Sequence, residues 1–161
     1  MKKALLSIIG CLVSFAVIAD YTPVKKEDVT TSTADGLQIQ TVAKATYNFA
    51  VDGGAIGAID LDVDIPANAV ITDGYIDVTT ALAGTGVAST VAISVEGAND
   101  IYSASTNLVD GGVAIYATVP VGTAATVVKT SAAKAVTLTI ATEALTNGVC
   151  TIVLKYDLLA K

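Results

Sequence analysis

The sequence predicts an all-β protein, an antiparallel β-sandwich of jelly-roll type with about eight strands. From Leu37 onward, short runs of alternating or β-branched residues are separated by turn signals about every ten residues. The composition agrees, because 53% of the residues are hydrophobic and only 5% are aromatic, and small or β-branched side chains suit closely packed sheets. No amphipathic helix of ordinary length is apparent. A chain of 161 residues suits one domain with a substantial core.

Turn residues bound most of the expected strands, because Gly, Asn and Asp tolerate positive φ or bond their own backbone. The stretch 141–148 is expected to make one helical turn at most before Cys150 begins the last strand. The turns in chain order are Asp52-Gly53-Gly54, Pro66-Ala67-Asn68, Gly84-Thr85-Gly86, Gly97-Ala98-Asn99-Asp100, Asp110-Gly111-Gly112 and Asn147-Gly148. The strands that they separate are expected at 37–51, 56–65, 69–80, 87–96, 100–106, 113–119, 124–130, 135–142 and 149–157.

Residues 1–19 have the layout of a secretory signal peptide. Lys2 and Lys3 precede an apolar run of sixteen residues that ends at Ala19, where cleavage is expected. A permanent transmembrane span is the weaker interpretation, because it needs about twenty apolar residues. Two alternatives remain open: a hydrophobic segment retained in an assembly, and a lipoprotein whose modified residue is Cys11.

The chain after the leader divides into an arm and a domain. Residues 20–36 are polar, charged and without periodicity, which indicates a tether or docking arm. Residues 37–161 form the expected sandwich domain. Cleavage after Ala19 would leave Cys150 as the single cysteine, so no intramolecular disulfide is expected and stability must come from sheet packing, oligomerisation or both.

The charged residues argue against nucleic-acid binding. All nine basic residues are lysines, no Arg, His or Trp is present, and fifteen acids give a net charge of -6. Without Lys2 and Lys3, seven lysines against fifteen acids give -8. A basic footprint for DNA or RNA is therefore missing, and a hydrolase lacks its usual base because there is no His.

Asp60, Asp62 and Asp64 are the candidate metal ligands, although we expect no metal site. A calcium loop starting at Asp60 would need Gly at its sixth position and Glu at its twelfth, where this chain has Ile. Residues two apart on a strand share a face, so the carboxylates are expected on a solvated face that also blunts edge aggregation. A non-standard cation site, completed by Asp73 or Asp77, is the alternative.

The remaining polar motifs have structural interpretations too. The glycine-rich stretch 52–57 lacks the spacing of a phosphate loop and is expected to be a tight turn. Cys150, between Val149 and Thr151, is expected to be a small buried hydrophobe. No catalytic residues and no cofactor are expected.

Two weaker hypotheses concern polar and aromatic side chains. A Ser-Lys or Thr-Lys pair among Lys129, Thr130, Ser131 and Lys134 is formally possible, but strand neighbours point to opposite faces. Tyr102 is a candidate for a contact surface, because Tyr is enriched in interfaces. Glycoside chemistry is disfavoured because sugar-cleaving sites usually stack their substrate on aromatic side chains and Trp is absent.

Three stretches, VDGGAIGAIDLDVDIPANAVITDGYIDVTTAL (51–82), STVAISVEGANDIYSA (89–104) and AVTLTIATEALTNGVCTIVLKYDLL (135–159), resemble tailed-phage virion structural proteins. A Gly-Gly turn, an IPANAVI corner, a VTTAL strand and a late LTxG turn carry the resemblance. It implies β-sandwich decorations or fibres on capsids, usually oligomeric, with a binding role. Capsid proteins normally need no export signal, so three explanations of residues 1–19 stay open: a virion anchor, an exported prophage-derived domain, or an independent surface protein.

The leading hypothesis is a non-enzymatic structural protein, located outside the cell or on a virion surface. It would self-associate or coat a capsid or surface lattice, with residues 20–36 as its docking arm. The alternative is a secreted or cell-surface adhesion or carbohydrate-binding module, with cations bound at Asp60, Asp62 and Asp64. Neither hypothesis involves nucleic acid or a permanent membrane span.

Overall fold

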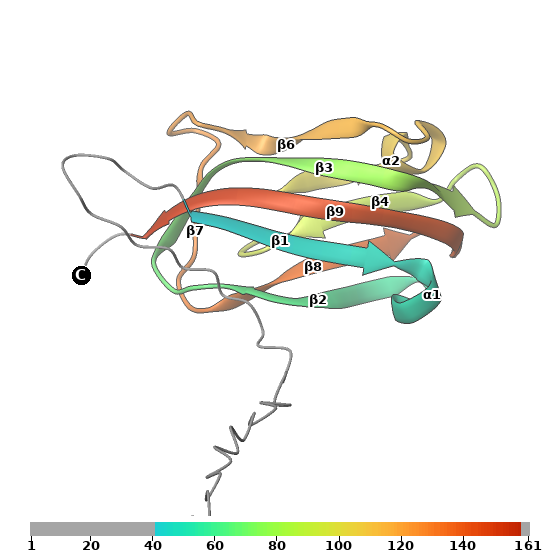
Figure 1. Ribbon diagram of the computed structural model, residues 1–161, viewed down its shortest axis with the longest axis horizontal. Helices are drawn as coiled ribbons and strands as arrows, with labels where there is room; N and C mark the ends of the chain where they lie inside the picture. Colours follow the sequence, from blue (N-terminus) through green and yellow to red (C-terminus); the bar gives the residue numbers. More distant parts are fainter. Residues whose placement is uncertain (1–40, 159–161) are drawn as a thin grey trace, which may run out of the picture.

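The computed structural model describes residues 41–158, which form a two-layer β-sandwich (Figure 1). The expectations for residues 1–19 and 20–36, a leader and an arm, lie outside the described residues. In chain order the elements are β1 (Thr41–Asn48), α1 (Phe49–Asp52), β2 (Gly57–Ile65), β3 (Ala69–Gly84), β4 (Thr90–Ser94), β5 (Tyr102–Ser105), α2 (Asn107–Asp110), β6 (Ile115–Val121), β7 (Val128–Lys129), β8 (Lys134–Ala141) and β9 (Leu145–Leu158).

The strands form two antiparallel sheets. The five-stranded sheet has the order β1-β9-β3-β6, with β7 also paired to β3, and the four-stranded sheet has the order β2-β8-β4-β5. Apart from the two-residue β7, this is the strand order of a jelly roll, which confirms the predicted fold class. The edge strands are β1 and β6 in one sheet and β2 and β5 in the other, and Figure 1 shows β6 and β2 on opposite rims of the molecule.

The core lies between the two sheets and follows from the alternation of each strand. On β3, Ile71, Ile76 and Val78 are fully buried. Their cross-strand partners on β9 are buried as well, since Ile76 is paired with Ile152 and Val78 with Cys150. The largest fully buried side chains are those of Tyr47, Ile65, Ile71, Ile76, Leu82, Ile93, Ile101, Leu108, Leu138, Ile140, Ile152 and Leu154. Each such side chain contributes about 1.5–3 kcal/mol on leaving water.

Several element boundaries differ from the prediction. The first strand ends at Asn48, because α1 begins there with a reciprocal cap: the Ala50 N–H donates to Asn48 Oδ1 (3.0 Å) and the Asn48 N–H donates to Asp52 Oδ2 (2.7 Å). No helical turn forms within 141–148, because β9 already begins at Leu145. The short helix α2 was not expected, and the strand expected at 124–130 is reduced to β7.

Neither of the two four-residue helices within residues 41–158 is long or apolar enough to cross a membrane.

Candidate interaction surfaces

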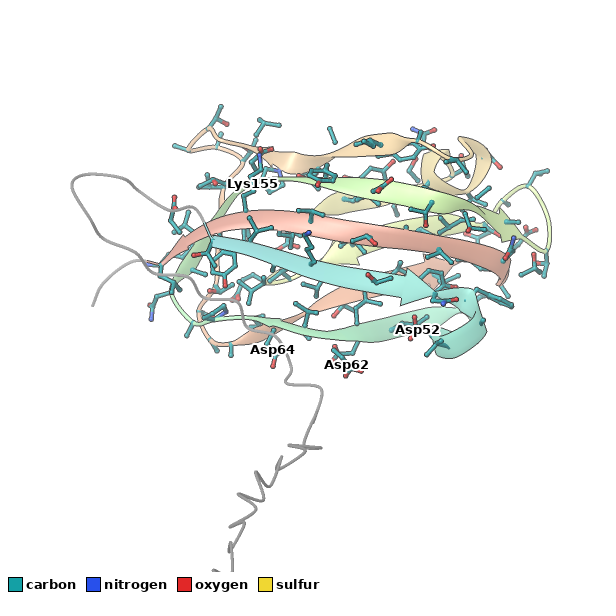
Figure 2. The ribbon with its side chains drawn as sticks, viewed as in Figure 1. Asp52, Asp62, Asp64 and Lys155 are labelled. Atoms are coloured by element: carbon teal, nitrogen blue, oxygen red, sulfur yellow. The ribbon has the colours of Figure 1, made fainter. Side chains whose placement is uncertain are left out.

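Strand β2 carries the three aspartates on its exposed face. Asp60, Asp62 and Asp64 are exposed, whereas Leu61 and Ile65 are buried. The alternation predicted from the sequence is therefore confirmed. Figure 2 shows Asp62 and Asp64 on the rim of the sandwich formed by β2. We call these three residues the acidic edge.

A bulge interrupts the pairing of β2 with β8. Asp60 is paired with Thr137 and Asp64 with Ala135, so three residues of β2 oppose a single residue of β8. Asp62 occupies the left-handed region at φ 56°. Its N–H donates to Asp60 Oδ1 over 3.1 Å, so one carboxylate of the acidic edge supports the bend in the backbone.

The other two candidate cation ligands lie on a different sheet. Asp73 and Asp77 are on β3, whereas the acidic edge belongs to the four-stranded sheet. Within residues 41–158, no three carboxylates or thiols are grouped so that they could hold a metal ion. The structure thus places the aspartates along one rim without bringing the five together.

Asp73 instead forms an ion pair with Lys155 of β9. The Lys155 Nζ donates to Asp73 Oδ2 over 2.8 Å. This hydrogen bond lowers the pKa of the Asp73 carboxyl and raises the pKa of the Lys155 ammonium. The pair lies on the outer face of the five-stranded sheet, in one cross-strand row with Val121 of β6.

Strand β6 is an edge strand of the opposite character. Its exposed positions are all apolar: Ile115 is 70% exposed, Val121 59% and Val119 40%, and Ala117 is exposed between them. The inward-facing Thr118 is buried. We call Ile115, Ala117, Val119 and Val121 the β6 strip. No charged residue occurs anywhere in 111–128, so the strip is also free of charge on both sides along the chain.

Two open grooves lie beside β6, on the side of β5 and α2. One, of about 270 Å³, is lined by Tyr102 and Asn107 together with Ala117 and Val119 of the strip. The other, of about 500 Å³, is lined by Asn107, Asp110, Gly111, Ala114 and Tyr116. Burial raises the pKa of Tyr102. The residue suggested by sequence as a contact candidate therefore borders the β6 strip.

The hydroxyls proposed for a lysine dyad have other partners. Thr130 is fully buried; its Oγ1 donates to the Pro66 carbonyl (2.6 Å) and accepts from the Ala69 N–H (3.0 Å). Ser131 Oγ bonds Glu96 Oε1 over 2.5 Å, which lowers the pKa of Glu96. Both hydroxyls thus brace loops of the sandwich.

The glycine-rich stretch forms the expected turn, and Cys150 is buried. Gly53 ends α1 at φ 75°, and Gly54 lies so close to the Leu145 carbonyl that a Cβ would clash with it. Burial raises the pKa of the Cys150 thiol to about 12, so the side chain behaves as an apolar group near neutral pH.

Comparisons with known proteins give a likeness of fold. No protein-family model and no curated protein matches the chain. A chain of the Ralstonia phage GP4 capsid matches with a TM-score of 0.55 and 20% identity, over 85% of this chain and 96% of that one. A chain of the cyanophage Pam1 capsid asymmetric unit gives 0.53 and 21%, over 85% and 99%. A chain of the acid-stable capsid of Helicobacter pylori bacteriophage KHP30 gives 0.52 and 16%, over 74% and 87%.

The chain therefore has a fold found in phage capsid structures, which confirms the resemblance to virion structural proteins at the level of fold. The sequence interpretation did not single out the β6 strip. Its signal was present: apolar residues at alternate positions from 115 to 121, inside a long stretch without charge. The position of β6 at the edge of a sheet could be recognised only from the strand order.

Proposed function

We propose that the chain is a non-enzymatic structural component of a virion, an oligomeric decoration or surface-coat protein that attaches to a capsid lattice. One observation carries the proposal: the match covers 96% and 99% of two chains from phage capsid structures. Those chains thus consist almost entirely of the part that matches the sandwich described above. A single sandwich of this kind is suited to attachment to a shell.

The two contrasting edges support a role in assembly. A rigid sandwich can present one surface to the lattice and another to neighbouring copies, with affinity gained from apolar area buried at about 25 cal/mol per Å². In this proposal, residues 20–36 are the docking arm and residues 1–19 are either removed on export or retained as a hydrophobic segment in the assembly. The protein then works on the virion surface or outside the cell.

Binding to particles tests the proposed function. The full chain, labelled with a fluorophore, is mixed with virions of the phage or prophage whose genome encodes it, purified without this protein. Co-sedimentation is expected to saturate at a fixed number of chains per particle. A chain that stays in the supernatant at every concentration would contradict the proposal.

Two further measurements separate the alternatives. The intact mass of the protein from native particles shows whether residues 1–19 have been lost. Calorimetric titration with calcium tests the cation-dependent adhesion module, for which binding would be saturable. We expect no saturable binding and no change in melting temperature, because the carboxylates of the acidic edge extend along one rim and are not gathered around a point.

A further inference from the structure

The β6 strip is a part of the described surface that a like-charged molecule can approach more easily than the acidic edge. The whole chain has a net charge of -6. Two copies that meet through their acidic edges would place three exposed carboxylates of one near three of the other, at a Coulombic cost. Residues 111–128 contain no charge. The charged neighbours of the strip are Asp77, beside Ile115, and the Asp73–Lys155 ion pair, beside Val121, so copies that meet there bring fewer unpaired carboxylates together than copies that meet through their acidic edges.

The exposed side chains of the strip also form a continuous apolar surface. Ile115 and Val121 are 70% and 59% exposed, and Val113, just before the strand, is 67% exposed. Tyr75 of β3, the cross-strand neighbour of Ala117, extends the surface inward from the rim, between Asp77 beside Ile115 and Asp73 beside Val121. The small Ala117 at the middle of the strip allows two sheets to approach closely.

Backbone hydrogen bonding already limits how a partner can bind. The Val119 N–H donates to the Ile101 carbonyl (2.8 Å), and the Val121 N–H donates to Thr126 Oγ1 (3.2 Å). The second half of β6 is therefore covered along its hydrogen-bonding edge by the chain's own segments. A partner must contact the outward side chains of the strip, since it cannot add a strand along the whole of β6.

We infer that the β6 strip is the contact between two copies of this chain, related by a two-fold axis that passes between Ala117 and Val119. In such an isologous arrangement, Ile115 of one copy packs near Val121 of the other and the reverse contact is equivalent. This inference deepens the proposed function, on which it rests, by naming the surface through which the oligomer forms.

The size of the strip sets the expected strength of the dimer. A stable interface buries about 800 Å² on each partner, whereas apolar patches on monomers are on the order of a few hundred Å². The strip is thus the centre of an interface whose rim includes the polar side chains of the adjoining grooves. We expect a reversible dimer whose population depends on concentration and is raised where copies are held close together on a particle.

The full chain under reducing conditions tests the inference by sedimentation velocity over a range of concentrations. The variant Ile115→Lys/Val121→Lys places two lysines in the contact, and its dimer dissociation constant is expected to rise at least about tenfold. The matched control is Val51→Lys/Val87→Lys, which puts the same charges at valines 79% and 88% exposed outside the strip. It is expected to dimerise like the unmodified chain. Ile115→Thr/Val121→Thr supplies a gentler second variant, also expected to weaken the dimer.

The outcomes separate this inference from the proposed function. An unmodified chain that stays monomeric at high concentration, or a dimer equally strong in all variants, overturns the inference even if the chain binds particles. Failure of the unmodified chain to bind particles, with a dimer that only the strip variants weaken, contradicts the proposed function and leaves the contact in place. If the partner of the strip is a lattice protein, the strip variants lose particle binding while the unmodified chain is monomeric, which also overturns the inference.

Discussion

Strands β2 and β6 occupy opposite rims of the sandwich, and both end a sheet. An edge strand must avoid uncontrolled pairing with other chains. Strand β2 does so with three exposed carboxylates and a bulge at Asp62, and it exposes no large apolar side chain on that face. Strand β6 exposes Ile115, Val119 and Val121, and the N–H groups of its second half donate hydrogen bonds to Ile101 and Thr126.

The two edges of this one fold are therefore suited to opposite kinds of contact. The acidic edge is suited to contact with water or with a basic surface, whereas the β6 strip is suited to an apolar contact. A molecule in which each rim has one behaviour can assemble in a defined orientation. Variants that exchange or weaken these features therefore test the comparison directly.

The largest effect is expected from removing charge at the acidic edge. Asp60→Val/Asp64→Val would give β2 an apolar outer face, so we expect aggregation at about a tenth of the concentration that the unmodified chain tolerates, as measured by light scattering. Asp62 is kept because its backbone is left-handed. The control Asp110→Val/Asp157→Val removes two exposed acids elsewhere. Equal aggregation of both variants would mean that net charge, and not the edge, keeps the chain soluble.

The second-largest effect is expected from a substitution of Thr130, whose hydroxyl connects the chain after β6 to the chain after β2. It lies in the segment after β6 and bonds the corner that follows β2, through the Pro66 carbonyl and the Ala69 N–H. Thr130→Val leaves these buried groups without their partner, and we expect urea unfolding to show a loss of about 1–3 kcal/mol.

Thr46→Val is the matched control for this change, because the Thr46 hydroxyl bonds Thr151 on the exposed surface. Its free energy of unfolding is expected to change by about 0.5 kcal/mol or less. Similar values for the two variants would show that the corner is not held by the Thr130 side chain.

A smaller effect tests the bulge of the acidic edge. Asp62→Val puts a β-branched residue at φ 56°, which we expect to cost about 1–2 kcal/mol more than Asp64→Val on the same strand. Both variants remove one carboxylate, so the difference reports the backbone. Asp62→Gly is expected to keep or raise stability, because glycine adopts this conformation without strain. Equal unfolding free energies for the two valine variants would mean that β2 has no left-handed residue at Asp62.

Local features of the acidic edge could be predicted from the sequence. Alternation along 59–65 places the carboxylates outward whatever β2 pairs with, and the turns at 52–54 and 66–68 follow from the backbone preferences of Gly, Pro and Asn. The bulge at Asp62 could not be predicted, because it depends on the register with β8, whose residues lie far along the chain.

The exposure of the β6 strip could not be predicted for the same reason, because it depends on pairing between residues that are far apart in the chain. The spacing predicts a strand near 113–119, but its position beside β3 at the end of a sheet follows from pairing across the chain. Thr130 is a comparable case: as a residue next to Lys129 it suggested a dyad, whereas its partners Pro66 and Ala69 are distant in sequence. The candidate surfaces could therefore be predicted where alternation along a single strand determines which side chains are exposed. They could not be predicted where exposure depends on the order of the strands in the sheet.

The smallest expected effect concerns the ion pair of Asp73 with Lys155, which lies beside Val121 at one end of the β6 strip. Asp73 is 47% exposed and Lys155 35%, so the pair is well solvated and Asp73→Asn should lower the melting temperature by about 2 °C or less at neutral pH. The pKa of Asp73 is lowered in the folded chain. The contribution of the ion pair to the free energy of unfolding is thus fully present above the pKa of an unfolded aspartate, about 3.9. It is lost as the pH falls through the lower pKa of Asp73 in the folded chain. The pKa of Lys155 is raised in the folded chain, so the same contribution is lost again in base when the pH rises through that pKa and the ammonium loses its proton.

Melting curves from pH 2 to pH 8 test this sign, with Asp77→Asn on the same strand as the control. The difference between Asp73→Asn and the unmodified chain should shrink toward zero in acid, because the unmodified carboxyl is then protonated as well. A difference that persists at pH 2, or that grows in acid, would mean that Asp73 acts through packing and not through its charge.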